Sequence, residues 1–312
     1  MTEKILVTGA SGFIGKRLIK KLAEQGHSVW GMFRYVTGRY VLGESFESVF
    51  ADVADYSGVV QIVKAIQPDR VIHLAAISAV SYSYEHPNEV NLVNYLGTIN
   101  LAESCRIEVP DLKQFVFAGS SEEYGNQTTF PIKEDVKENP NSPYSMAKNA
   151  STKYLQYMSV AYDFPMTVLR PFNTYGRTEN LHFVTERIMS QMLRGQEYIR
   201  LGDPEPSRDL LYVDDHVNGY NLAIKDDKAL GEIINISTGK ECTIRELVQK
   251  IAKETGWEGE VIWQTIPKRP LDIHRLVGDN WKARQLMQWT PTVGLDEGLR
   301  ETVKGLRPQF SL

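Results

Sequence analysis

Short apolar runs alternate with stretches of helical periodicity through the first half of the chain. The runs have the length and composition of buried strands, and they cover residues 4–8 (KILVT), 28–34, 49–53, 70–76 and 114–120. Helical spacing follows at 18–27, which ends at Gly26, at 59–67 before Pro68, and from Pro87 to Arg106. This alternation predicts βαβ units and a parallel sheet that helices cover on both faces.

The alternation of strand and helix patterns becomes less regular after about residue 170. Residues 166–173 predict a strand that runs into a loop, 183–195 an amphipathic helix, 207–224 a strand and then a helix, and 232–237 one more buried strand. Residues 241–307 predict short helices and proline-punctuated loops. We therefore expect an α/β fold. A doubly wound parallel-sheet domain covers 1–170, with 209–240 returning to it, and a smaller carboxyl-terminal α/β domain, mainly 171–312, is interleaved with it.

The composition is that of an ordinary globular protein. Of its 312 residues, 42% are apolar and 24% charged, and the net charge of −4 gives no electrostatic reason to expect nucleic acid. No apolar run approaches the roughly 18 residues of a membrane span. Cys105 and Cys242 have no CxxC spacing and the amino terminus has no signal-peptide pattern, which together predict a cytoplasmic protein. The scattered histidines predict no metal site.

A glycine-rich turn follows the first strand. The stretch TGASGFIG places Gly9, Gly12 and Gly15 between that strand and the first helix. Gly9 would allow a tight turn, Gly12 a close approach of the backbone to a pyrophosphate, and Gly15 close packing of helix on strand. The free N–H groups at the helix start would face the phosphates, with Phe13 and Ile14 beside them. A tight turn without a ligand is the alternative, and the strand-turn-helix context favours dinucleotide binding.

The end of the second strand usually selects between the two nicotinamide dinucleotides. An acid there binds the ribose hydroxyls, whereas a basic residue accommodates a 2′-phosphate. The stretch GMFRY holds Arg34 and no acid, which predicts NADP as the preferred cofactor, with NAD as the alternative. A solvated surface arginine is the other interpretation of Arg34. Further cofactor contacts are expected where the third and fourth strands end, with ordinary packing as the alternative: Asp52, Val53, Leu74, Ala75 and Ala76.

A serine, a tyrosine and a lysine form the second candidate site. Ser142 and Pro143 make a good helix start, and Tyr144 and Lys148 then lie four residues apart on one face. Tyrosine is a poor base at neutral pH, but a neighbouring ammonium favours the phenolate, as does an oxidised nicotinamide ring, and both would bring its pKa closer to the working range. Ser120, at the end of the fifth strand, can bond to the same substrate hydroxyl. We therefore predict a catalytic site in which Tyr144 and Lys148 also contact the cofactor.

Seven motifs extend over nearly the whole chain, in the order TGASGFIG, HLAA, GSSEEYG, PYSMAK, RPFNTYG, SRDLLYVDD and RPLDI. Through these seven motifs, the sequence resembles the extended short-chain dehydrogenase/reductases that act on nucleotide sugars, which are the NAD-dependent epimerase/dehydratase family. It is most similar to the GDP-mannose 4,6-dehydratases and GDP-4-keto-6-deoxymannose reductases. The resemblance implies a Rossmann-type cofactor domain, a Ser-Tyr-Lys site, and a carboxyl-terminal domain that binds a nucleotide-diphosphate sugar. It also implies a homodimer joined through helices near 87–106 and 144–163.

The resemblance also implies residues that contact the nucleotide diphosphate. By motif position these are Asn173, Arg208 and Arg269, with Arg177 and Arg187 as weaker candidates. Guanidinium groups suit this task because they offer paired donors to phosphate oxygens. For Arg208 and Arg269, the alternative is an ion pair with Asp209 or Asp272.

Two adjacent glutamates follow the serines of GSSEEYG. The family's dehydratases carry a carboxylate two residues after the Ser/Thr, where Glu122 stands. This implies that Glu122 removes the C5 proton of the sugar after Tyr144 has taken the proton of the C4 hydroxyl. Glu123 is expected to point the opposite way along extended backbone, to be structural or solvated, and to tolerate replacement by glutamine.

The implied activity is 4,6-dehydration of an NDP-hexose through a 4-keto intermediate, with a tightly bound nicotinamide cofactor that is recycled. A 4-epimerase or a 4-keto-6-deoxyhexose reductase on the same scaffold remains an alternative, because the reductases carry a similar GSSEEYG stretch. Glu122 could also simply hold its loop by bonding backbone N–H groups. A dinucleotide-binding sensor without turnover would not need Ser120, Tyr144 and Lys148 together. The sugar and the base stay open.

Overall fold

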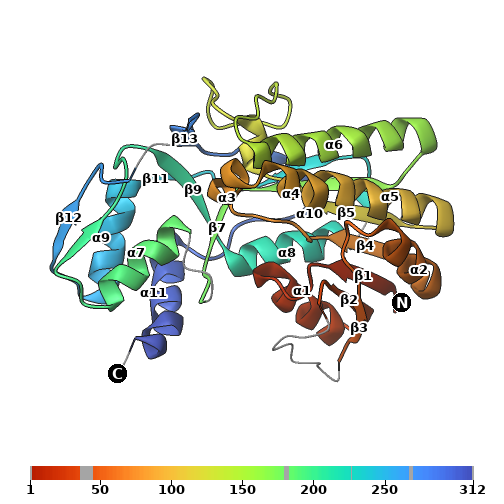
Figure 1. Cartoon of the computed structure of the whole chain (residues 1–312), viewed down its shortest axis with the longest axis horizontal. Coiled ribbons are helices and arrows are strands. Elements are labelled where there is room, and N and C mark those ends of the chain that lie inside the picture. The colour runs from red at the N-terminus through yellow and green to blue at the C-terminus, as the bar shows by residue number, and fades with distance from the viewer. Residues whose placement is uncertain (1, 36–44, 179–182, 226, 267–269, 311–312) are drawn as a thin grey trace.

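A seven-stranded parallel sheet forms the centre of the larger lobe (Figure 1). The computed structural model describes residues 2–35, 45–178, 183–225, 227–266 and 270–310. The strands lie in the order β10-β6-β5-β4-β1-β2-β3. Their bounds are β1 (Lys4–Thr8), β2 (Ser28–Phe33), β3 (Glu47–Phe50), β4 (Arg70–His73), β5 (Gln114–Ala118), β6 (Met166–Pro171) and β10 (Ile233–Ile236). The order reverses between β1 and β4, and ligands of open α/β sheets bind at such a reversal, outside the carboxyl ends of the strands.

Helices cover both faces of this sheet, as the alternating pattern predicted (Figure 1). One face packs against α1 (Phe13–Glu24), α8 (Val213–Ala223) and α10 (Trp281–Met287). The other face packs against α2 (Tyr56–Ile66), α5 (Gly97–Glu108) and α6 (Pro143–Tyr162). Because both faces are buried, the central strands are almost continuously apolar; Ile5, Leu6 and Val7 of β1 are all fully buried.

The predicted helix from Pro87 to Arg106 is present but changes its winding midway. After α3 (Val80–Glu85) come α4 (Pro87–Asn91), a π-helical turn (Leu92–Leu96) and then α5. Asn94 lies in the π-helical turn, accepts a hydrogen bond from the Ile77 N–H at 2.8 Å and donates to the Ile77 carbonyl at 3.0 Å. The turn therefore fixes the segment that follows β4, at the edge where a ligand is expected. Single π-helical turns are frequent at functional sites.

The predicted strands are confirmed, with shifts at their ends. β2, β4 and β5 end before the last residues of the predicted runs, and the third strand lies at Glu47–Phe50 instead of 49–53. The residues beyond β4 leave the ladder because their backbone makes other bonds. The Ala75 N–H, for example, donates to Thr8 Oγ1 at 3.2 Å.

In the part of the smaller lobe that the structure describes, there are three α-helices and two small sheets. The first sheet joins β7 (Asn173–Tyr175), β9 (Ser207–Tyr212), β11 (Glu241–Thr243) and β13 (Arg275–Leu276), and the second pairs β8 (Tyr198–Arg200) with β12 (Glu260–Ile262). The helices are α7 (Val184–Leu193), α9 (Ile244–Thr255) and α11 (Leu295–Leu306), which share one apolar core. Over 241–307 the predicted helices and loops are present, but the short strands β11, β12 and β13 were not predicted. α9 and α11 each have 12 residues, and α9 begins with a capping box between Thr243 and Glu246 that the sequence already carried.

The chain passes between the two lobes more than once. From the smaller lobe it returns through α8 to β10, which pairs with β6, and it returns again at α10. This course is consistent with the interleaved division that we propose, 1–170 with a return within 209–240. Among the residues that the structure describes, no helix combines the length and apolarity that crossing a bilayer would require.

Candidate active site

Five parallel strands bring candidate residues to one edge of the sheet. Gly9 follows β1, Arg34 follows β2, Asp52 follows β3, Leu74 follows β4, and Ser120 follows β5. Because all these strands run in the same direction, their carboxyl ends meet at that edge. The sheet therefore collects residues that are far apart in the sequence into one site.

The glycine turn has the geometry expected of a dinucleotide cradle. Gly9 has a φ of 67°, and a Cβ on it would stand 2.8 Å from the Ala75 nitrogen. A Cβ on Gly15 would collide with the Gly9 carbonyl oxygen. Gly12 is the N-cap of α1, where no side chain caps the helix and no acid lies in the first turn. The helix N–H groups are thus left for an anionic ligand, and these residues fit the pyrophosphate of a dinucleotide.

A buried histidine fixes the turn after β4. His73 Nδ1 lies 2.7 Å from Thr8 Oγ1, and its Nε2 lies 3.1 Å from Thr98 Oγ1. Thr98 donates its own hydroxyl to the Asn94 carbonyl at 2.7 Å, so His73 donates from Nε2 and accepts from Thr8 at Nδ1.

This histidine remains uncharged. Burial, assisted by the charge of Lys148, lowers the pKa of His73 to about 3. His73 was not among the predicted site residues. The signal for it was a polar residue at the end of an otherwise apolar strand, in the HLAA stretch.

Arg34 and Asp52 form an ion pair at the rim of the cradle. Arg34 Nε lies 2.8 Å from Asp52 Oδ2, and the two side chains are 43% and 30% exposed. Asp52 Oδ1 accepts the Ala54 N–H at 3.0 Å. Arg34 is therefore oriented by a partner, but a ligand can still reach it. The side chain of Val53 is buried, as its packing alternative predicted.

Ser120, Tyr144 and Lys148 are brought together as the motif spacing predicted. Ser142 caps α6 by accepting the Ser145 N–H at 3.1 Å, so Tyr144 and Lys148 lie in the first two turns of the helix. Lys148 Nζ donates to the carbonyl of Ala118, the last residue of β5, at 2.8 Å. Tyr144 is hydrogen-bonded to Ser120.

The electrostatics of this group differ from the prediction. Burial raises the pKa of Tyr144 above its ordinary value, and the charges of Glu122 and Glu123 raise it further. The hydrogen bond with Ser120 and the charge of Arg177 lower it, but by less than burial raises it. The expectation that a neighbouring ammonium brings the Tyr144 pKa down is therefore wrong for the protein alone.

Lys148 itself is affected by its surroundings. Burial lowers the pKa of Lys148 to about 8, while the charge of Glu123 acts in the opposite direction. The ammonium lies 4.8 Å from the centroid of the Phe117 ring and bonds to the Ala118 carbonyl. Its role before a ligand binds is therefore to join α6 to β5.

The two glutamates occupy different environments. Ser121–Tyr124 form a 3-10 turn, in which successive side chains point about 120° apart, so the expectation of extended backbone was wrong. Glu122 is partly buried, and its charge contributes to the raised pKa of Tyr144. Glu123 is fully buried and paired with Arg170 at 2.8 Å. It is structural and not solvated, so it is not a position where glutamine would be tolerated.

The structure describes only some of the residues that were predicted to contact the nucleotide diphosphate. Asn173 opens β7, and among the described residues its buried side-chain oxygen has no hydrogen-bond partner. Such an oxygen suits a donor on a ligand. Arg208 Nη2 lies 3.8 Å from Asp272 Oδ1, so one of the two ion pairs given as alternatives is present. Arg269 lies outside the described residues.

Asp209 was the other residue considered as an ion-pair partner of Arg208, but its hydrogen bonds are made elsewhere. Its carboxylate accepts N–H groups of Thr238 at 2.8 Å, Gly239 at 2.9 Å and Gly278 at 3.3 Å. Burial raises the pKa of Asp209 to about 6, against the effect of these bonds. Asp209 therefore holds two loops of the smaller lobe together.

Arg177 lies closer to the cofactor cradle than the resemblance implied. Its guanidinium stacks on Phe13 at 4.5 Å and on Phe183 at 3.8 Å. It donates to the Thr174 carbonyl and pairs with Glu186 at 3.6 Å. Both of these polar contacts are made by one nitrogen of Arg177, Nη1. Arg187 is exposed on α7.

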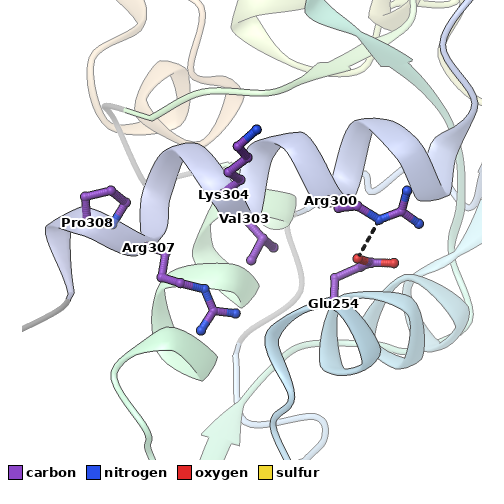
Figure 2. Close-up of a pocket in the computed structure, with 6 residues that line it drawn as sticks. All are labelled: Glu254, Arg300, Val303, Lys304, Arg307 and Pro308. Carbon is purple, nitrogen blue, oxygen red and sulfur yellow. Dashed lines mark hydrogen bonds and ion pairs between the residues drawn. The ribbon is translucent and has the colours of Figure 1, made fainter.

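A surface hollow of about 510 Å³ lies between α9 and α11, at the far end of the smaller lobe (Figure 2). It is lined by Glu254, Arg300, Val303, Lys304, Arg307 and Pro308. No predicted site residue lines this hollow, and it is separate from the strand ends that carry the candidate chemistry.

The comparison with known proteins identifies the family of the chain. The family described as GDP-mannose 4,6 dehydratase matches residues 6–302. The chain belongs to this family, and it is a nucleotide-sugar-modifying enzyme of the extended short-chain dehydrogenase/reductase type. A UDP-glucose 4-epimerase of Mycolicibacterium smegmatis is 33% identical over 97% of this chain and 98% of its own length. A GDP-mannose 4,6-dehydratase of Yersinia enterocolitica is 29% identical, over 97% and 93%.

Solved structures share the whole fold. The UDP-glucose 4-epimerase of Thermotoga maritima with UDP-glucose has a TM-score of 0.91 and 32% identity, covering 99% of this chain and 100% of its own. The Thermus thermophilus UDP-glucose 4-epimerase with NAD has a TM-score of 0.89 and 31% identity, over 97% and 99%. The protein RMD of Pseudomonas aeruginosa with NADPH has a TM-score of 0.84 and 25% identity, over 99% and 100%.

Proposed function

We propose that the protein dehydrates an NDP-hexose to its 4-keto-6-deoxy product. The observation that carries this proposal is the position of Glu122, two residues after Ser120 in the short turn that Ser120 caps, from which its charge acts on Tyr144. An epimerase needs no second acid or base there. A dehydratase needs one, since the proton on C5 must be removed after C4 has become a ketone. The match to the dehydratase family over residues 6–302 supports the same reaction.

Each of the catalytic residues has a defined task in this proposal. Tyr144 accepts the proton of the C4 hydroxyl, while Ser120 bonds to the same oxygen and orients it. Lys148 supplies positive charge near the tyrosine. The nicotinamide dinucleotide that the glycine turn would hold would supply the hydride transfer of this reaction. Glu122 removes the C5 proton and returns it to the C6 hydroxyl, which leaves as water. When hydride is added at C6, C5 takes up a proton that balances the one that Tyr144 removed from the C4 hydroxyl.

A 4-epimerase is the second candidate function. The support for it is the higher identity to UDP-glucose 4-epimerases, 33% against 29% for the dehydratase. An epimerase would use Ser120, Tyr144 and Lys148 in the same way and would leave Glu122 without a chemical role. A 4-keto-6-deoxyhexose reductase is a third outcome on the same scaffold.

The mass of the product distinguishes the three. The purified protein is incubated with UDP-, GDP- and dTDP-hexoses, and for the reductase with 4-keto-6-deoxy sugars and NADPH. Loss of one water supports the dehydratase. An unchanged mass with inverted C4 identifies the epimerase, and a gain of two hydrogens identifies the reductase. Either of the last two results would overturn the proposal.

NADP is the proposed cofactor. The guanidinium of Arg34 is partly exposed and held in place by Asp52, so it can meet a 2′-phosphate without first being ordered. Asp52 would then share Arg34 with the phosphate, which weakens the preference compared with an unpaired arginine. The solved relatives named above hold NAD in one case and NADPH in another.

The diphosphate of the substrate is proposed to contact Asn173, Arg208 and Arg269, on the side of the smaller lobe. The buried, unpartnered side-chain oxygen of Asn173 is an acceptor, so it suits a hydroxyl or N–H donor of the nucleotide sugar, while any contact of Asn173 with the diphosphate would come from its side-chain N–H. Arg208 and Asp272 lie 3.8 Å apart, a distance at which a phosphate could displace the carboxylate.

A second copy of the chain is the proposed occupant of an apolar surface on α5 and α6. These helices lie side by side, joined by the Tyr154 hydroxyl and Glu103 at 2.7 Å. Large apolar side chains are exposed on them and on the preceding π-helical turn: Leu92, Leu96, Ile107, Met146, Tyr157, Val160 and Tyr162. Val160 is the most exposed of them, at 88%, and the support for an interface is the number of such side chains on neighbouring elements, since single exposed apolar residues are ordinary.

A further inference from the structure

A buried ion pair lies next to the turn that carries Ser120 and Glu122. Glu123 and Arg170 have side chains with no solvent exposure. Arg170 donates to Glu123 Oε2 from Nε at 3.1 Å and from Nη2 at 2.8 Å. Arg170 belongs to β6, the strand beside β5. The pair therefore joins the turn after β5 to the neighbouring strand.

The other oxygen of Glu123 holds Ser120. Oε1 accepts the Ser120 backbone N–H at 2.8 Å, and Ser120 Oγ accepts the Glu122 N–H at 3.2 Å. A Cβ on Gly119 would stand 2.8 Å from the same Oε1, so a larger residue there would displace the carboxylate. One buried carboxylate thus positions Ser120, and Ser120 positions the backbone of Glu122.

The network continues beyond Arg170 to other elements. Nη2 also donates to Glu138 at 2.9 Å, and Glu138 pairs with Lys153 of α6 at 3.0 Å. The guanidinium lies 4.6 Å from the centroid of the Tyr124 ring, whose hydroxyl donates to Asn235 of β10 at 2.7 Å. The turn is therefore held by β6, β10 and α6 together.

Stability alone does not explain why a charged pair stands here. Burying two charges carries a large desolvation cost, and a well-packed apolar pair of similar volume is often as stable or more stable. An apolar pair, however, offers no acceptor for the Ser120 N–H in a fixed direction. A displacement of about 1 Å in a reacting group can cost on the order of a hundredfold in rate, so such a fixed direction has a catalytic consequence.

We propose that Glu123 and Arg170 are positioning residues, which hold Ser120 and Glu122 where both meet the sugar beside Tyr144. The proposal rests on the roles given above to Ser120 and Glu122. Neither Glu123 nor Arg170 contacts the reacting atoms, so we assign their effect to the geometry of the turn, in addition to the charge of Glu123 that acts on Tyr144 and Lys148.

Two variants test this. Glu123→Gln keeps the shape but cannot accept from both Ser120 and Arg170 with one oxygen. Glu123→Leu/Arg170→Met replaces both members of the pair by apolar side chains. It serves as the test if Glu123→Gln does not fold, because it leaves neither charge of the pair buried without its partner. The matched control is Glu3→Gln, which breaks the ion pair of Glu3 with the buried Arg70 (2.9 Å) at the start of β4, the opposite edge of the sheet.

The measurements are kcat, KM for the nucleotide sugar, dinucleotide binding, and amide exchange of residues 117–125. We expect both variants to lose about 10- to 100-fold in kcat, with KM and dinucleotide binding within about twofold, and to exchange the Ser120 amide faster. Glu3→Gln should lose stability but keep kcat within about twofold.

A folded apolar double variant with wild-type kcat would overturn the proposal, as would a loss carried by KM alone. If the wild-type protein converts no nucleotide sugar at all, it is the proposed function that fails. Amide exchange then decides the positioning by itself. Faster exchange at Ser120 supports it, and unchanged exchange overturns it.

Discussion

Lys148 donates from Nζ to the carbonyl oxygen of Ala118 at 2.8 Å, two residues before Ser120. This bond connects the helix that carries Tyr144 to the strand that carries Ser120. It is formed by an ammonium that is almost completely buried. The catalytic group is therefore assembled in the protein alone, at the cost of keeping a charge away from water.

The burial of Lys148 predicts a pH-dependent stability. Its pKa is about 8 in the folded protein against 10.5 for the ordinary group, so the unfolded chain binds more protons between these values. This group therefore makes the protein more stable as pH rises from about 8 toward 10.5. Lys148→Met should lose that rise, which amounts to roughly 1–3 kcal/mol. Denaturant unfolding of both proteins at pH 7 and pH 10 measures it. A constant stability difference between the two proteins would contradict the prediction.

Tyr144→Phe should abolish hydride transfer and leave dinucleotide binding within about twofold. The phenyl ring fills the same buried space, but it cannot take the C4 proton, and loss of a positioned base typically costs about a hundredfold to ten-thousandfold. Single-turnover formation of reduced nicotinamide gives the rate, and fluorescence titration gives the binding. Near-normal turnover in the folded variant would rule out the assignment of Tyr144.

The pair of Arg34 and Asp52 predicts the cofactor preference of two variants. Arg34→Ala should weaken NADP binding by about tenfold and leave NAD nearly unchanged, because only NADP carries the 2′-phosphate. Asp52→Asn should strengthen NADP binding relative to NAD, since the carboxylate no longer competes for Arg34. Titration of stripped protein with both dinucleotides checks this. Tighter binding of NAD by the wild type would show that the NADP preference is wrong.

Glu122→Gln should stop the proposed reaction halfway. The first step needs Ser120, Tyr144 and Lys148, so reduced nicotinamide should accumulate. The C5 proton should no longer exchange with deuterated water, because the carboxylate is missing. Mass spectrometry of the sugar after incubation in deuterated water measures the exchange.

The control for Glu122 must be chosen from the structure. Glu123→Gln is unsuitable because Glu123 is buried against Arg170. Asp135→Asn removes the same charge at an exposed position of the following loop and should be silent. If the Glu122→Gln variant still exchanges the C5 proton of the sugar with deuterated water at the wild-type rate, reductase or epimerase becomes the better assignment of the protein's activity.

The apolar surface of α5 and α6 predicts a dimer. Val160→Asp should shift the protein toward monomer, because it places a charge in a covered interface. Light scattering at micromolar concentration measures the mass. Val184→Asp, at an exposed valine on α7, is the matched control and should leave the mass unchanged. A monomeric wild-type protein at this concentration would contradict the proposed homodimer.

Several features of the site follow from residues that are close in the sequence. The three glycines of TGASGFIG, and the four-residue spacing of Tyr144 and Lys148, are properties of a single turn or helix. Local sterics and helical periodicity decide such features, so the pattern of the chain predicts them. The parallel sheet also followed, because the alternation of strands and helices permits few other arrangements.

The sequence by itself thus determined the sheet, the glycine cradle and the place of Ser120, Tyr144 and Lys148. Only the tertiary structure decided which charges meet: Arg34 with Asp52, and Glu123 with Arg170 from a strand 47 residues away. It also decided that Tyr144 has a raised pKa and that Arg177 stacks on Phe13. The reason is physical. Desolvation and ion pairing depend on every segment packed around a group, and those segments come from distant parts of the chain.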